Sequence, residues 1–182
     1  MLIPNLIIAV CWLTFLVYWF VSSRGAKRNV SKNHTTATVR IGFVVLAIAV
    51  GIMGSHFRSL YRVTPLWGWI GAIITVFGVA IAIYARRYLG NNWGMPMSVK
   101  EHPELVSTGP YAYVRHPIYS AMILTLAGTF LAAGFSWLLI LVIYLAYFIY
   151  SAKREEELLE KTFPDTYPAY KARTKMLIPF IF

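Results

Sequence analysis

Apolar residues gather in five segments along the chain, and short polar stretches separate them. The segments are Leu2–Val21, Ile41–Met53 with an extension to Phe57, Leu66–Tyr84, Ile118–Ala133 and Phe135–Tyr150. The first has about 20 residues, enough to cross a hydrocarbon core about 30 Å thick. The third carries Gly68, Gly71 and Gly78, small residues that allow helices to pack closely. The pattern predicts an all-α integral membrane protein with about five transmembrane helices.

The last two segments meet at Gly134 and predict a C-terminal helical hairpin. Each segment has 16 residues, which gives a helix about 24 Å long at about 1.5 Å per residue. The pair is therefore either a tight hairpin that barely crosses the membrane or two ordinary spans with ragged ends. The tail, 155–172, is expected to form a helix that Pro164 and Pro168 interrupt, with Tyr167 and Tyr170 at the membrane interface.

Composition supports a membrane protein of one domain. The 182 residues are 58% hydrophobic and 13% charged, whereas soluble domains carry about 25% charged residues. Within this domain, residues 1–87 are expected to supply N-terminal membrane helices, and residues 88–182 hold most of the polar motifs. Because Cys11 is the single cysteine, an intrachain disulfide and a cysteine-based metal cluster are both excluded.

Charge is distributed unevenly along the chain. The formal net charge is +10, and all seven acidic residues lie at Glu101 or later. Lysine and arginine concentrate in 23–40, in 86–116 and after Tyr150, and are few in 58–65. The positive-inside rule then places the three basic regions in the cytoplasm. Positive charge beside apolar spans favours contact with anionic lipid over nucleic acid. We expect a multi-pass protein whose polar clusters share the cytoplasmic side.

The first candidate cluster is the segment GPYAYVRHPIY at Gly109–Tyr119, directly before the hairpin. Proline suits the first turn of a helix, so Pro117 is expected to begin one, with His116 near its N-cap. Free N–H groups and the positive end of the helix dipole favour an anionic group there. Alternatively, Arg115 and His116 only anchor the chain at the membrane interface.

The second candidate cluster is the charged run 153–157, KREEE, which follows the hairpin. One of its carboxylates is a candidate to accept a hydrogen bond from a ligand amine or ribose hydroxyl, and Glu155 is the preferred candidate. Alternatively, the run is a solvated helix end that Lys153 and Arg154 neutralise. Neither a zinc-binding HExxH, nor a nucleotide-binding glycine motif, nor a GxSxG nucleophile motif occurs. We therefore expect no metal site and no serine nucleophile.

Taken in order, these motifs resemble one family. The order is Glu104–Tyr111, Arg115–Tyr119, the hairpin, Glu155-Glu156-x-x-Leu159, then Phe163, Tyr167, Tyr170 and a final Ile178-Pro179. It resembles the membrane-integral isoprenylcysteine carboxyl methyltransferases and the related phospholipid methyltransferases. The resemblance covers roughly 88–182.

The resemblance implies an S-adenosylmethionine-dependent methyltransferase with a cytoplasmic cofactor pocket. By resemblance, the cofactor-binding residues are Glu104, Leu105, Val106, Tyr111, His116, Pro117, Ile118, Tyr119 and Glu155, and the residues expected to act on the acceptor are Arg154 and Tyr119. Two positions depart from the family. A usual histidine is replaced by Pro103, with His102 beside it, and a substrate-linked arginine is replaced by Ser151, for which Arg154 or Lys153 is a candidate substitute.

Three functions follow as alternatives. The first is methylation of the carboxylate of an isoprenylcysteine-like or isoprenoid substrate. The second is N-methylation of a phospholipid amine headgroup. The third is a non-catalytic membrane binding or assembly protein that keeps the fold. The presence of His116, Tyr119 and Glu155 counts against this third function. The expected partners are a lipid-like or prenylated small molecule and the membrane lipid.

Overall fold

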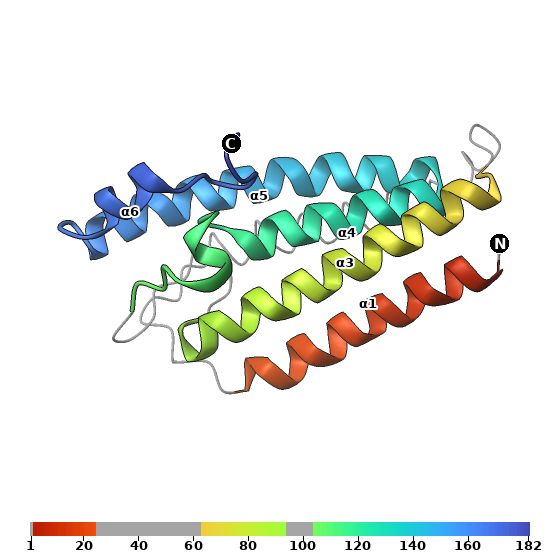
Figure 1. The fold of residues 1–182 in the computed structure, drawn as a ribbon, viewed down its shortest axis with the longest axis horizontal. Helices are drawn as coiled ribbons and strands as arrows, with labels where there is room; N and C mark the ends of the chain where they lie inside the picture. The colour runs from red at the N-terminus through yellow and green to blue at the C-terminus, as the bar shows by residue number, and fades with distance from the viewer. Residues whose placement is uncertain (1, 25–62, 94–103) are drawn as a thin grey trace.

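A computed structural model describes residues 2–24, 63–93 and 104–182 (Figure 1). The described helices are α1 (Leu2–Ser23), α3 (Pro65–Leu89), α4 (Pro117–Ala133), α5 (Phe135–Thr162) and α6 (Tyr167–Arg173), with short 3₁₀ turns at Gly90–Asn92 and Gly109–Ala112. Within these ranges, extended pairing is limited to one isolated bridge between Val114 and Lys175. The described part of the chain is therefore all-helical, as the sequence predicts.

Three of the described helices are long and apolar enough to cross a membrane. These spans are Leu2–Ser23, Pro65–Asn92 and Ser136–Thr162, whereas α4 is a shorter apolar helix. The predicted segment Ile41–Met53 lies outside the described residues. The structure therefore contains three candidate spans in its described ranges, and the prediction of about five transmembrane helices stays a prediction.

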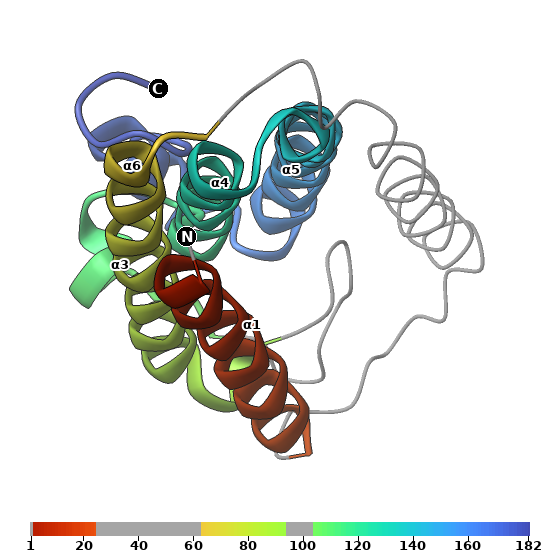
Figure 2. The same ribbon diagram turned by 90° about the vertical axis from the view of Figure 1, so that its right-hand side faces the viewer.

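The helices form a bundle in which α3 packs against both α1 and α4, and α4 packs against α5 (Figures 1 and 2). Arg86 of α3 donates a hydrogen bond to the carbonyl of Ser22 at 2.8 Å, which joins the C-terminal ends of α1 and α3. Trp12 of α1 donates to the Thr129 hydroxyl of α4 at 3.2 Å. Helices α1 and α3 therefore run in the same direction, and α4 runs in the opposite direction.

Small residues allow α3 and α4 to approach each other closely. A Cβ added to Gly128 would lie 2.6 Å from the carbonyl oxygen of Gly71, and one added to Gly78 would lie 2.7 Å from the backbone nitrogen of Thr125. The Thr75 and Thr125 side chains are fully buried, and each hydroxyl donates to the carbonyl four residues earlier. Small and internally satisfied polar residues suit a helix contact inside a membrane.

Helix α5 extends beyond Tyr150, where the last predicted apolar segment ends. It continues without a break from Phe135 to Thr162, so the apolar segment and the start of the predicted tail helix are one element. Hydropathy falls after Tyr150, but lysine, arginine, glutamate and leucine all favour helix. The helix ends before Pro164, as predicted. Pro168 lies in the first turn of α6, so it helps to start a helix and does not interrupt one.

Positive charge lies at one end of the described bundle. The described lysines and arginines are Arg24, Arg86, Arg87 and Arg115, together with those after Tyr150. The C-terminal ends of α1, α3 and α5 and the start of α4 meet there (Figure 1). The two polar clusters therefore lie at the same end of the bundle, and a cytoplasmic location for this end remains a prediction of the positive-inside rule.

Candidate functional site

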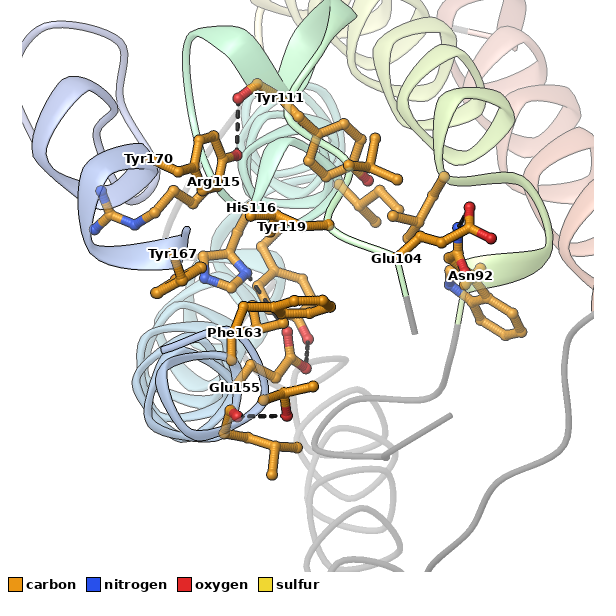
Figure 3. Close-up of a pocket in the computed structure, with 18 of the residues that line it drawn as sticks. Asn92, Glu104, Tyr111, Arg115, His116, Tyr119, Glu155, Phe163, Tyr167 and Tyr170 are labelled. Carbon is orange, nitrogen blue, oxygen red and sulfur yellow. Dashed lines mark hydrogen bonds and ion pairs between the residues drawn. The ribbon is translucent and has the colours of Figure 1, made fainter. Parts of the chain in front are cut away.

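A cavity of about 320 Å³ lies at the basic end of the bundle (Figure 3). Its volume falls in the range of about 300–1,000 Å³ that is usual for small-molecule sites. The wall is built from α1, the end of α3, the segment 104–106, residues of the segment before α4 and of the first turns of α4, the second half of α5, and α6. Residues far apart in the sequence therefore converge on one space.

Glu155 and Tyr119 form the polar centre of the cavity wall. The Tyr119 hydroxyl donates to Glu155 Oε1 at 2.5 Å, and Glu155 Oε2 lies 3.5 Å from Nδ1 of His116. The His116 ring is parallel to the Tyr119 ring, with centroids 5.4 Å apart, and Tyr119 stacks in turn on Phe148 at 4.8 Å. An acidic group, an imidazole and two aromatic rings are thus fixed relative to one another.

His116 is held in place by the C-terminal segment. Its backbone N–H donates to the carbonyl of Met176 at 3.1 Å, and the N–H of Arg115 donates to that of Lys175 at 2.8 Å. Pro117 then begins α4 with His116 as the N-cap. The local geometry of His116 therefore depends on residues about 60 positions later in the chain.

A buried ion cluster lies behind the cavity wall. Glu156 Oε1 accepts from Arg115 Nε at 2.7 Å, and Glu156 Oε2 lies 3.2 Å from Lys171 Nζ. His116 Nε2 lies 3.4 Å from Glu156 Oε1, but its alignment is too poor for a hydrogen bond, so this contact is electrostatic. A buried carboxylate requires such partners, and Glu156 finds them on α6 and in the segment before α4.

The charge state of His116 follows from its two acidic neighbours. Burial by itself lowers the pKa of this imidazole, but the adjacent Glu155 and Glu156 carboxylates outweigh burial and raise the pKa above its ordinary value. Nearby negative charge favours the protonated form of histidine. The site therefore favours a positively charged ring at His116 with a carboxylate near each nitrogen.

The opposite wall carries a second carboxylate. Glu104 accepts from the Asn92 side chain at 3.2 Å, and Leu105 and Val106 continue this wall. Figure 3 shows Glu104 and Asn92 across the cavity from Glu155. The site thus presents acidic groups on two sides and apolar surface between them.

Two buried tyrosines close the α6 side of the cavity. The Tyr170 hydroxyl donates to the carbonyl of Tyr111 at 2.8 Å. Burial is the main cause that raises the pKa of Tyr111 and raises that of Tyr170 to about 12, so both phenols stay protonated at neutral pH. Tyr167 and Tyr170 are almost fully buried. Their rings therefore pack against the protein because α6 folds back onto the cavity, and their expected place at the membrane interface stays a prediction.

The structure brings most of the residues implied by the resemblance into one wall. Those that line the cavity are Glu104, Leu105, Val106, Tyr111, His116, Ile118, Tyr119 and Glu155. Pro117 does not line it and instead starts α4. His102 and Pro103 lie outside the described residues.

Arg154 lies away from the cavity wall, and its expected action on the acceptor stays a prediction. Its side chain is 54% exposed and pairs with Glu157 at 2.9 Å, and it is absent from the cavity wall that the described residues form. Successive residues of a helix point about 100° apart, so Arg154 and Glu155 cannot share one face. Among the described lining residues, Arg115 is the one that carries a permanent positive charge.

Several lining residues escaped the sequence analysis. They include Phe15 and Trp19 of α1, Asn92 and Trp93 after α3, Met122 of α4, and Phe148, Leu158 and Thr162 of α5. They are ordinary apolar or polar residues that no motif position specifies. Only the packing of α1 beside α3 and α4, and the continuity of α5, could place them at the site.

The described fold and site define a class of protein: a helical membrane protein with a carboxylate-lined and aromatic cavity at the basic end of its bundle. A profile described as phospholipid methyltransferase matches residues 66–166, more than half of the chain. The chain belongs to this phospholipid methyltransferase family. It is also 29% identical over 135 residues to a protein-S-isoprenylcysteine O-methyltransferase of Dictyostelium discoideum, which covers 69% of this chain and 54% of that protein. The chain thus spans about half the length of this curated relative.

Proposed function

We propose that this protein is an S-adenosylmethionine-dependent methyltransferase that acts on a lipid-like acceptor at the membrane surface. One observation carries the proposal: Glu155, Tyr119 and His116 are fixed together in a cavity of ligand size, in a chain of the phospholipid methyltransferase family. The resemblance had assigned these three residues to the cofactor.

The donor groups of the cavity fit the chemistry of this cofactor. S-adenosylmethionine combines an amino-acid end that carries an ammonium and a carboxylate, ribose hydroxyls and an aromatic base, and it supplies an activated methyl group on a positively charged sulfonium. The carboxylates of Glu155 and Glu104 suit the ammonium and the hydroxyls, and the aromatic and aliphatic lining suits the base. We propose that Glu104, Leu105, Val106, Tyr111, His116, Ile118, Tyr119 and Glu155 hold it.

The protein's own contribution to catalysis is alignment and exclusion of water. Displacement at an already activated methyl group needs the acceptor in line and close, and fixed geometry can supply a large part of the rate. The stacked rings of His116, Tyr119 and Phe148 form a rigid wall. The Tyr119 hydroxyl holds Glu155 in one orientation. We propose that Tyr119 acts in this way, by positioning Glu155 against the cofactor.

The acceptor is proposed to be amphiphilic. Phe15, Trp19 and Met122 line the cavity from α1 and α4, so apolar surface leads from the membrane-spanning helices to the polar centre. The relative's name supports the carboxylate of an isoprenylcysteine-like substrate, which needs no base. The family's description supports a phospholipid headgroup, and an amine there must lose a proton before it can accept a methyl group.

The test has two steps on protein purified in detergent. Calorimetry should first detect S-adenosylmethionine binding in the micromolar range, about −7 to −8 kcal/mol. A lipid extract and a prenylcysteine analogue are then incubated with a methyl-labelled donor. Methyl esters release labelled methanol in base, whereas N-methyl products do not, so one hydrolysis separates the two acceptor classes. Absence of binding up to millimolar ligand by folded protein would refute the methyltransferase and leave the non-catalytic alternative.

A further inference from the structure

Glu156 is a buried carboxylate that the cavity lining does not include. Its residue is 4% exposed, and its side chain contacts three basic groups. These groups are Arg115 at 2.7 Å, Lys171 at 3.2 Å and His116 at 3.4 Å. They come from the segment before α4 and from α6. One carboxylate of α5 therefore joins two other parts of the chain.

Arg115 extends this cluster to the C-terminal segment. Its Nη1 donates to the carbonyls of Thr174 at 2.5 Å and Lys171 at 3.3 Å, while its Nε donates to Glu156. The backbone of the same arginine pairs with Lys175. The guanidinium is thus held by the end of α6 and by Glu156 at once, and its position fixes that of the next residue, His116.

His116 transmits this arrangement to the cavity. One ring nitrogen lies near Glu156 behind the wall, and the other lies near Glu155 in the wall. The charged groups that face the ring are these two carboxylates of α5, with Arg115 beside it in sequence and Lys171 of α6 on the far side of Glu156. The remaining face stacks on Tyr119.

We propose that Glu156 is a positioning residue, which neutralises Arg115 beside His116 and thereby keeps His116 charged and correctly oriented in the cavity wall. Without this carboxylate, Nε2 of His116 would lose the negative charge 3.4 Å away, and the buried Arg115 guanidinium of the preceding residue would lose its ion-pair partner. Like charges disfavour protonation of histidine, so the ring would lose its proton and its attraction to Glu155. The inference rests on the proposed function because it gives His116 a part in holding the cofactor.

The experiment measures His116 directly. Histidine-labelled protein in detergent is titrated by NMR, and His116→Gln assigns the signal among the four histidines. In the unaltered protein His116 should titrate above the ordinary histidine pKa of about 6.5. Glu156→Gln should lower that pKa and weaken S-adenosylmethionine binding roughly tenfold, the effect of losing a hydrogen bond to a charged group. Glu157→Gln is the matched control and should change neither, because Glu157 is exposed and pairs with Arg154.

Each outcome decides the proposal. A His116 that titrates at or below its ordinary pKa in the unaltered protein overturns it, as does Glu156→Gln with an unchanged titration. If Glu156→Gln does not fold, Lys171→Met takes its place. Lys171 is 41% exposed, and removal of this cation should raise the His116 pKa; an unchanged value overturns the proposal. The titration needs no cofactor, so failure to bind S-adenosylmethionine would refute the proposed function without altering the link between Glu156 and His116.

Discussion

Glu155→Gln tests the centre of the proposed site. The substitution keeps the size of the side chain and removes its charge. It therefore weakens the 2.5 Å bond from Tyr119 and the 3.5 Å contact with His116, and it removes the negative charge available to an ammonium group. A hydrogen bond to a charged group contributes about 1.5–3 kcal/mol. Cofactor affinity should fall roughly ten- to hundredfold.

Glu157→Gln is the control for this prediction. The two residues are close in sequence and lie on the same helix, but the Glu157 side chain is 57% exposed and forms a surface pair with Arg154. Exposed pairs contribute about 0–1 kcal/mol to stability, so this variant should bind the cofactor as the unaltered protein does. Affinity is measured by calorimetry, with melting curves to show that both variants are folded. Equal affinity in the two variants would mean that the acidic run is a solvated helix end and that Glu155 has no part in the site.

Four further predictions address charge, exposure, packing and topology. Because the pKa of His116 is raised in the folded protein, its protonated ring stabilises the fold at pH values below the unfolded pKa of about 6.5. This stabilisation is lost as the pH rises through the folded pKa. The difference in melting temperature between the unaltered protein and His116→Gln should therefore shrink from acidic to alkaline pH, and a constant difference would contradict it. Arg154→Ala should leave both cofactor affinity and methyl-transfer turnover unchanged, because this side chain is exposed; a marked loss of turnover with normal cofactor affinity would restore it to the acceptor site. Gly128→Val should destabilise the bundle by about 1–3 kcal/mol in chemical unfolding, since a Cβ there meets the Gly71 carbonyl. Reporter fusions at Phe182 and near Thr64 should report the cytoplasm and the opposite side, respectively, and the reverse result would invert the proposed orientation.

Several features of the fold could be predicted because they depend on local pattern. Apolar length marks candidate spans such as α1 and α3, and Gly71 and Gly78 mark a close contact that the structure shows between α3 and α4. The start of α4 at Pro117 follows from the fixed backbone of proline. The last helix extends beyond the apolar segment that ends at Tyr150, because a fall in hydropathy marks where a helix leaves the lipid and not where the helix stops.

Hydropathy and motif order are properties of the chain, and they are enough to predict a helical membrane protein with two polar clusters beside one hairpin. The roles of three adjacent glutamates follow instead from the folded structure. On one helix Glu155 faces the cavity, Glu156 is buried in an ion cluster and Glu157 is exposed. Neighbouring helical positions point about 100° apart, so identical side chains meet different surroundings. Those surroundings, supplied by Arg115, Lys171 and the C-terminal segment, come from distant parts of the sequence that only folding brings together.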